Sequence, residues 1–145
     1  MITIYYKYEK MQHSHKHANP VRDALVGVGL ALFSILNMEL MPERLAFSFV
    51  VLMLPAIAAI YLGFALASNG KLNVFIQIGA VVLYTGMAMY AYEFHSWITL
   101  EIGIGLHCLW DLMFHKHESV PHFYVPFCAV FDISFSLWLI YRYVL

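Results

Sequence analysis

The chain has 145 residues, of which 62% are hydrophobic and only 12% are charged. A soluble domain is about half apolar and about a quarter charged, so this composition cannot surround a core with a polar surface. The net charge of -1 excludes a basic surface for nucleic acid, and two cysteines are too few for a secreted disulfide framework. We therefore predict an integral membrane protein whose surface faces lipid.

The segment 1–23 is polar and aromatic, and we predict that it is an N-terminal tail outside the membrane. No apolar run precedes a cleavage site here, so we expect no signal peptide. Met11 is an alternative start for the chain. His13, His15 and His17 form a tract that could bind a metal, but a solvated tail is the favoured interpretation.

Five apolar segments follow the tail, and each is long enough to cross a membrane. A helix rises about 1.5 Å per residue, so segments of about 18–23 residues span roughly the 30 Å hydrocarbon core. The segments are continuously apolar and do not alternate as membrane strands do. We predict an all-α fold, a polytopic bundle of five transmembrane helices in one domain, residues 24–145. The predicted helices are residues 24–41, 45–67, 72–92, 96–114 and 123–143.

The connections are short, so we expect consecutive helices to be antiparallel neighbours. Asp23 is expected to cap or complement the start of the first helix, and Pro55 predicts a kink in the second. Small residues allow helix backbones to approach closely in lipid, where no hydrophobic effect drives association. On this ground, close contacts are predicted at Ala56, Ala59, Gly63, Gly79, Gly86 and Gly103.

The distribution of Lys and Arg predicts a multi-pass protein of the cell membrane with a cytoplasmic N-terminus and an outer C-terminus. Only Arg44 and Arg142 would then lie outside. A start at Met11 would remove Lys7 and Lys10 and leave four basic residues inside against two outside. The six residues that would lie inside are Lys7, Lys10, Lys16, Arg22, Lys71 and Lys116.

Ionisable residues inside the fourth segment form the first half of a candidate site. His107, Asp111 and His115 are spaced by four, so all three share one face of a helix. Along the axis, His107 and Asp111 are about 6 Å apart, but His107 and His115 are about 12 Å apart. One ion can therefore bind two consecutive members of this trio, and its other ligands must come from another helix.

The fifth segment supplies the second half of the candidate site. The hairpin turns near residue 119, so Asp132, thirteen residues later, reaches the depth of His107, twelve residues earlier. The same count places Cys128 at the depth of Asp111. We predict a cluster of His107, Asp111 and Asp132 with Cys128 beside it. A weaker second group is predicted at the membrane edge, formed by His115, His117 and His122.

Two aspartates at this depth need partners, because each costs roughly 2.5–3.5 kcal/mol at the centre of a membrane helix. Imidazole and carboxylate groups bind zinc and non-haem iron, and the same groups can transfer protons. A structural alternative is a hydrogen-bonded His–Asp pair that fixes the register of the helices. Glu101 is about 120° around the helix from His107 and about 9 Å along it, so we expect it outside the cluster, where it could line an outer vestibule.

The arrangement of His107, Asp111 and His115 followed by Cys128 and Asp132 resembles a small family of uncharacterised bacterial integral membrane proteins. The resemblance covers about the last forty residues of the chain. The family pattern has a second histidine directly after the position of His115, whereas this chain has Lys116 there and His117 one position later. The resemblance implies no activity. The residues that carry it are His107, Trp110, Asp111, His115, a proline at 121 or 126, Cys128 and Asp132.

Two classes of function fit these residues. The first is a membrane metalloprotein, or an enzyme acting on a lipid-soluble substrate, in which a divalent ion such as zinc or iron activates a water molecule. The alternative is a proton- or ion-coupled carrier, or an accessory membrane subunit, that uses the same residues as a relay. We expect membrane lipids as partners and, for a carrier, a homo-oligomer. A bis-histidine haem protein ranks third, because residues 24–92 contain no histidine.

Overall fold

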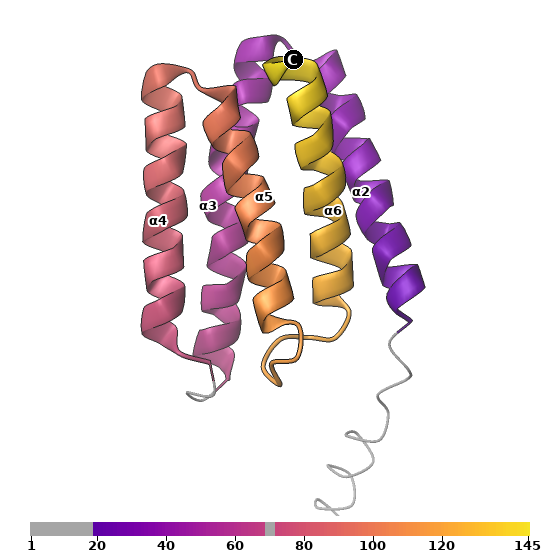
Figure 1. The fold of residues 1–145 in the computed structure, drawn as a ribbon, viewed down its shortest axis with the longest axis vertical. Helices are drawn as coiled ribbons and strands as arrows, with labels where there is room; N and C mark the ends of the chain where they lie inside the picture. The colour runs from indigo at the N-terminus through magenta and orange to yellow at the C-terminus, as the bar shows by residue number, and fades with distance from the viewer. Residues whose placement is uncertain (1–18, 69–71) are drawn as a thin grey trace, which may run out of the picture.

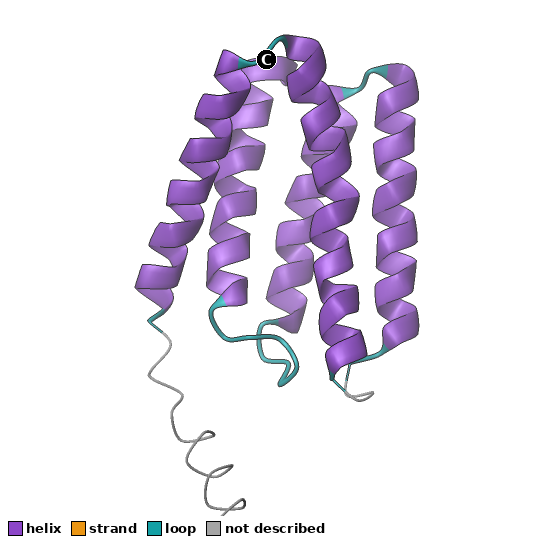
Figure 2. Ribbon diagram, turned by 180° about the vertical axis from the view of Figure 1, so that it is seen from behind, coloured by secondary structure: helices purple, strands orange, loops and turns teal. Residues whose placement is uncertain are grey.

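The computed structural model describes residues 19–68 and 72–145, and these fold into a bundle of long helices (Figure 1). The described residues contain no strand, as Figure 2 shows, so the predicted all-α class is confirmed. Five helices are long and apolar enough to cross a membrane, which confirms the predicted number of spans. The elements are α2 (Pro20–Leu40), α3 (Glu43–Ala67), α4 (Val74–Phe94), α5 (Trp97–Phe114) and α6 (Tyr124–Leu139), which continues as the π-helix η1 (Ile140–Val144). The histidine tract and the alternative start lie outside the described residues.

The first helix begins four residues before the predicted position because of its cap. The Asn19 side chain accepts hydrogen bonds from the backbone N–H groups of Val21 and Arg22, and Pro20 has no N–H to satisfy. Asp23 is therefore not the cap. It lies in the first turn, where its negative charge complements the helix dipole.

A two-residue connection makes α4 and α5 antiparallel. His95 ends α4 in the left-handed conformation, with a φ of 48°, and Ser96 caps α5 by accepting a hydrogen bond from the Thr99 N–H. This turn fixes the register with which α5 enters the bundle. The fourth and fifth membrane segments then form the hairpin that carries the candidate site.

The helices α3 to α6 pack around a common core, and α2 lies at the edge of the bundle beside α6 (Figure 1). The short connection between α2 and α3 makes them antiparallel, but the main partner of α2 is α6. The expectation of antiparallel neighbours is therefore met by α2 and α3, although α2 contacts α6 more extensively. The start of α2, the α3–α4 connection and the α5–α6 turn lie at one end of the bundle, opposite the C-terminus.

Two glycines allow the closest helix contacts. A Cβ atom at Gly27 would overlap the carbonyl oxygen of Phe127 on α6, and a Cβ atom at Gly103 would lie 2.7 Å from the side chain of Leu54 on α3. The predicted contact at Gly103 is thus confirmed, whereas the contact at Gly27 was not predicted. The other predicted contacts are wrong, because these small residues are on exposed faces of α3 and α4: Ala56, Ala59, Gly63, Gly79 and Gly86. Residue size alone does not say which face of a helix meets a neighbour.

Candidate metal centre

Four side chains that can bind metals converge inside the bundle. They come from α5 and α6, and all are buried. One nitrogen, sulfur or carboxylate oxygen from each lies within 4.8 Å of those of the other three. The four residues are His107, Asp111, Cys128 and Asp132. The convergence expected from the sequence is therefore present in the structure.

The register of the α5–α6 hairpin produces this convergence. The Nδ1 atom of His107 lies 2.7 Å from Oδ2 of Asp132 and 3.8 Å from Oδ2 of Asp111. The first pair crosses between the two helices at the depth that the hairpin count predicts. The second pair is spaced by four on α5, so both side chains point to the same side of that helix.

A third helix holds Asp111 from the opposite side. The phenol of Tyr61, which is buried on α3, donates a hydrogen bond of 2.8 Å to Oδ1 of Asp111. The sequence analysis missed this residue. Tyr61 is the only tyrosine of its membrane segment, and that polar group in an otherwise apolar helix is the signal that could have identified it.

Aromatic rings enclose the imidazole of His107. The ring centroids of Tyr61 and Tyr84 lie 5.9 Å and 5.8 Å from it, and both rings meet it edge to face. On the next turn of α6, the Cys128 thiol lies 3.5 Å from the Tyr124 hydroxyl, in a weak hydrogen bond. The polar cluster is therefore surrounded by apolar and aromatic groups, as its buried position requires.

Some polar atoms of the cluster have no hydrogen-bond partner in the described part of the chain. These include Oδ2 of Asp111, Oδ1 of Asp132 and Nε2 of His107. Buried polar atoms are normally satisfied, because an unpaired one loses the hydrogen bonds that water would give it. A bound cation would satisfy the two carboxylate oxygens that have no donor.

The donor set matches transition metals better than calcium or magnesium. Imidazole nitrogen, thiolate sulfur and carboxylate oxygen are all zinc ligands, whereas calcium and magnesium bind mainly oxygen. With zinc bonds of about 2.0–2.3 Å, tetrahedral donor atoms lie about 3.3–3.8 Å apart. The four donor atoms, which lie within 4.8 Å of one another, are separated by at most about 1 Å more than this spacing.

The histidines at the membrane edge are not brought together. His115 is exposed and its Nδ1 lies 2.9 Å from the carbonyl oxygen of Leu112 on its own helix. His117 accepts a hydrogen bond from the Ser119 N–H, and His122 is exposed beside the start of α6. The group of metal-binding side chains found among the described residues includes none of these three histidines.

Glu101 also lies outside the cluster, as expected. Its Oε1 accepts a hydrogen bond of 2.9 Å from the Ser136 hydroxyl, which joins α5 to α6 at a different depth. Glu39 lies at the exposed end of the bundle, 3.3 Å from Nε of Arg142. Cys108 is buried, but it is not a member of the group either, and neither cysteine forms a disulfide.

The fold and this cluster together define a multi-pass membrane helix bundle with a buried polar centre of histidine, aspartate and cysteine. A family model described as a family of unknown function (DUF6010) matches residues 22–143, so the chain belongs to that family. The match extends over all five spans, well beyond the C-terminal stretch that carries the sequence resemblance. No curated protein and no solved structure matches the chain.

Proposed function

We propose that the protein binds a divalent transition-metal ion, with zinc as the first candidate, inside the membrane. One observation carries this proposal. Four buried donor atoms of the types that zinc prefers lie within 4.8 Å of one another, and two of the carboxylate oxygens have no partner among the described residues. The ligands would be His107, Asp111 and Asp132, with the Cys128 thiol beside them.

The balance of charge supports a cation over a hydrogen-bonded pair alone. Asp111 and Asp132 together carry two negative charges when both are ionised, and a protonated His107 would neutralise only one of them. A divalent ion with a neutral imidazole neutralises both. Charge that is left unbalanced in a low-dielectric interior is costly, so the metal-bound state is the better compensated one.

The same charge balance bears on how many protein ligands the metal ion would have and whether water can bind to it. A neutral His107 and two carboxylates hold a divalent ion without net charge, and Cys128 can then remain a thiol. Three protein ligands leave one position for water, which is the arrangement of catalytic zinc sites. We propose that such an ion would activate water toward a lipid-soluble substrate, since the cluster is enclosed by helices that face the bilayer. If Cys128 binds as a thiolate, the site is closed and its role is structural.

A second function is favoured by the hydrogen bonds themselves. Tyr61 donates to Asp111 at 2.8 Å, and Nδ1 of His107 lies 2.7 Å from Asp132. The same Nδ1 lies 3.8 Å from Asp111, which is longer than a hydrogen bond, so a proton would pass between the two pairs only when these groups approach each other. In this case the protein would be a proton-coupled carrier or an accessory subunit, and we expect a homo-oligomer because the chain has no internal repeat.

We also propose that the chain lies in the cell membrane with its N-terminus in the cytoplasm. Arg22 and Lys116 lie toward one end of the bundle, and Arg44 and Arg142 toward the other. In the sequence, Lys7, Lys10 and Lys16 precede α2, and Lys71 falls between α3 and α4. Basic residues are retained on the cytoplasmic side, so this asymmetry supports the proposed orientation.

Elemental analysis of the detergent-purified protein, after incubation with zinc and gel filtration, tests the metal proposal. We expect about one ion per chain in the wild type, and strong loss in both Asp111→Asn and Asp132→Asn, because each variant removes one ligand. Glu101→Gln is the matched control, since it neutralises a carboxylate of α5 outside the cluster, and we expect full occupancy. A wild-type chain that binds no zinc, cobalt or iron would overturn the proposal and leave the proton relay.

A further inference from the structure

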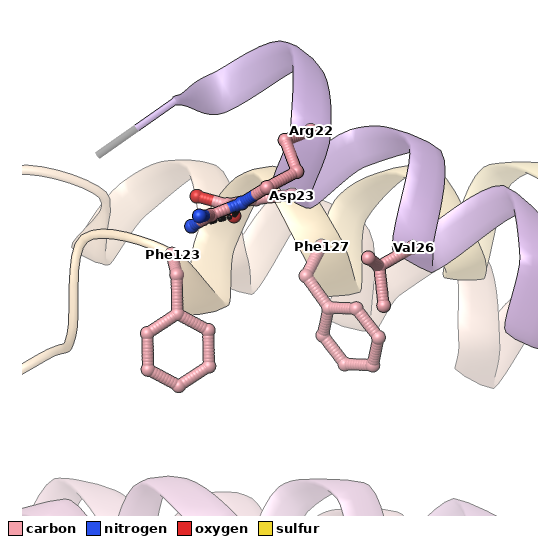
Figure 3. A pocket seen from close by; sticks show the side chains of 5 residues that line it. All are labelled: Arg22, Asp23, Val26, Phe123 and Phe127. Atoms are coloured by element: carbon pink, nitrogen blue, oxygen red, sulfur yellow. Dashed lines mark hydrogen bonds and ion pairs between the residues drawn. The ribbon is translucent and has the colours of Figure 1, made fainter. Parts of the chain in front are cut away.

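A second site lies at the end of the bundle where α2 and α6 begin. A cavity of about 360 Å³ opens there, and Figure 3 shows the side chains that line it. None of these residues belongs to the metal cluster, so the site is independent of the proposed metal function. The lining residues are Arg22, Asp23, Val26, Phe123 and Phe127.

The polar half of this cavity is incompletely paired. Asp23 is only 6% exposed, and its Oδ1 accepts hydrogen bonds from Nε and Nη2 of Arg22, at 3.1 and 2.9 Å. Its Oδ2 is buried and has no partner among the residues described. Arg22 is 67% exposed and bonds only Asp23 within that part of the chain, so its guanidinium has further donors available.

The other half of the cavity is apolar and open to the surroundings. The rings of Phe123 and Phe127 and the side chain of Val26 extend to the same side of the cavity (Figure 3). Val26 is 56% exposed and Phe123 is 54% exposed. Both helices begin here as membrane spans, so this level corresponds to the boundary between lipid headgroups and acyl chains. A polar pair beside apolar rings at this depth suits an amphipathic lipid.

We propose that the cavity binds the headgroup of a phospholipid that carries a primary amine, such as phosphatidylethanolamine. The ammonium group would donate to the Asp23 carboxylate and satisfy Oδ2, while Arg22 turns outward and donates to the phosphate. The acyl chains would cover Phe123, Phe127 and Val26. The ion pair between Arg22 and Asp23 is thereby exchanged for two ion pairs with the lipid, one from each residue, and the total charge stays balanced.

This arrangement discriminates between lipids that have the same acyl chains. A choline headgroup has no N–H to donate, so it leaves the Asp23 oxygen unsatisfied in a buried place. A glycerol headgroup lacks the positive charge that would replace Arg22 beside the carboxylate. The cavity volume also lies in the range of known ligand sites, about 300–1,000 Å³.

Native mass spectrometry of the detergent-solubilised full chain tests the proposal. The probes are dioleoyl lipids with ethanolamine, N-methylethanolamine, N,N-dimethylethanolamine, choline and glycerol headgroups. We expect the affinity to decrease as N–H donors are removed, with the ethanolamine lipid bound at least tenfold more tightly than the choline lipid, because the choline lipid cannot donate a charge-assisted hydrogen bond to Asp23. Equal binding of these two lipids would overturn the proposal.

Variants locate the preference in the cavity. Asp23→Asn should abolish the preference for the amine, and Arg22→Gln should weaken binding of all the lipids, because it removes the phosphate contact. Glu43→Gln, an exposed acid in the first turn of α3 at the opposite end of the bundle, should change neither. Retention of the preference in a folded Asp23→Asn variant would refute the assignment. If that variant does not fold, the methylation series on the wild type decides. Competition by free phosphoethanolamine as effective as that of the lipid would overturn the lipid as occupant.

Discussion

Replacing Gly27 by alanine should separate α2 from α6. The added methyl group would overlap the carbonyl oxygen of Phe127, which belongs to the backbone of a helix and cannot rotate away. The two helices must therefore move apart along their main contact. Overpacking of this kind destabilises a protein by about 1–3 kcal/mol.

Gly29 provides the matched control, because it lies on the same helix and a Cβ atom there has no neighbour within 4 Å. Both substitutions gain the same helix propensity of alanine over glycine, so that gain cancels when the two variants are compared. We expect Gly27→Ala to be less stable than Gly29→Ala by about 1–3 kcal/mol. The assay is reversible unfolding in mixed detergent micelles with increasing denaturing detergent.

The zinc content of the folded Gly27→Ala protein should remain that of the wild type, since α2 supplies no ligand to the cluster. Equal stabilities of the two alanine variants would refute the reasoning, because they would mean that the backbones of α2 and α6 are not in contact at Gly27.

Three further outcomes are expected. Tyr61→Phe should weaken zinc binding about 10–100-fold in competition with a chromophoric chelator, because it removes the hydrogen bond that orients Asp111. Tyr84→Phe is the control, since Tyr84 has no hydrogen bond to either aspartate in the structure. Equal zinc affinities of the Tyr61→Phe and Tyr84→Phe variants would contradict this role of Tyr61. Cobalt-loaded protein should show no thiolate charge-transfer band, because Cys128 remains a thiol in the open, three-ligand site; a band that Cys128→Ser removes and Cys108→Ser retains would contradict the open site and assign a closed, structural one. A phosphatase reporter at the C-terminus should be active outside the cell, whereas the same reporter active at the N-terminus would reverse the proposed orientation.

The features that could be predicted from the sequence are those formed within one segment or between two segments that are adjacent in the chain. Continuous apolar runs of this length predict the five spans, because a helix satisfies its own backbone in lipid and membrane strands would alternate in polarity. The contact of His107 with Asp132 could be predicted because both lie on one hairpin, where counting from the turn gives the depth. No such count connects Tyr61 to Asp111, which are fifty residues apart on helices that are not consecutive.

The packing of α2 could not be predicted for a related reason. Apolar residues cover every side of this helix, so its pattern does not distinguish the face toward protein from the face toward lipid. Gly27 and Gly29 are two residues apart and chemically identical, yet only Gly27 meets another backbone. The choice of face depends on the shape of α6, which local sequence does not encode.

The pairing of α2 with α6 has a consequence for the order in which the chain is assembled. Among the described helices, α2 is synthesised before the others, but its main partner, α6, follows the other four. Until α6 has been inserted, α2 lacks this partner and the metal cluster lacks Cys128 and Asp132. Insertion of α6 therefore gives α2 its main partner and completes the polar centre in the same step. A nascent chain that stops before Tyr124 should leave α2 without this partner and be unable to retain zinc.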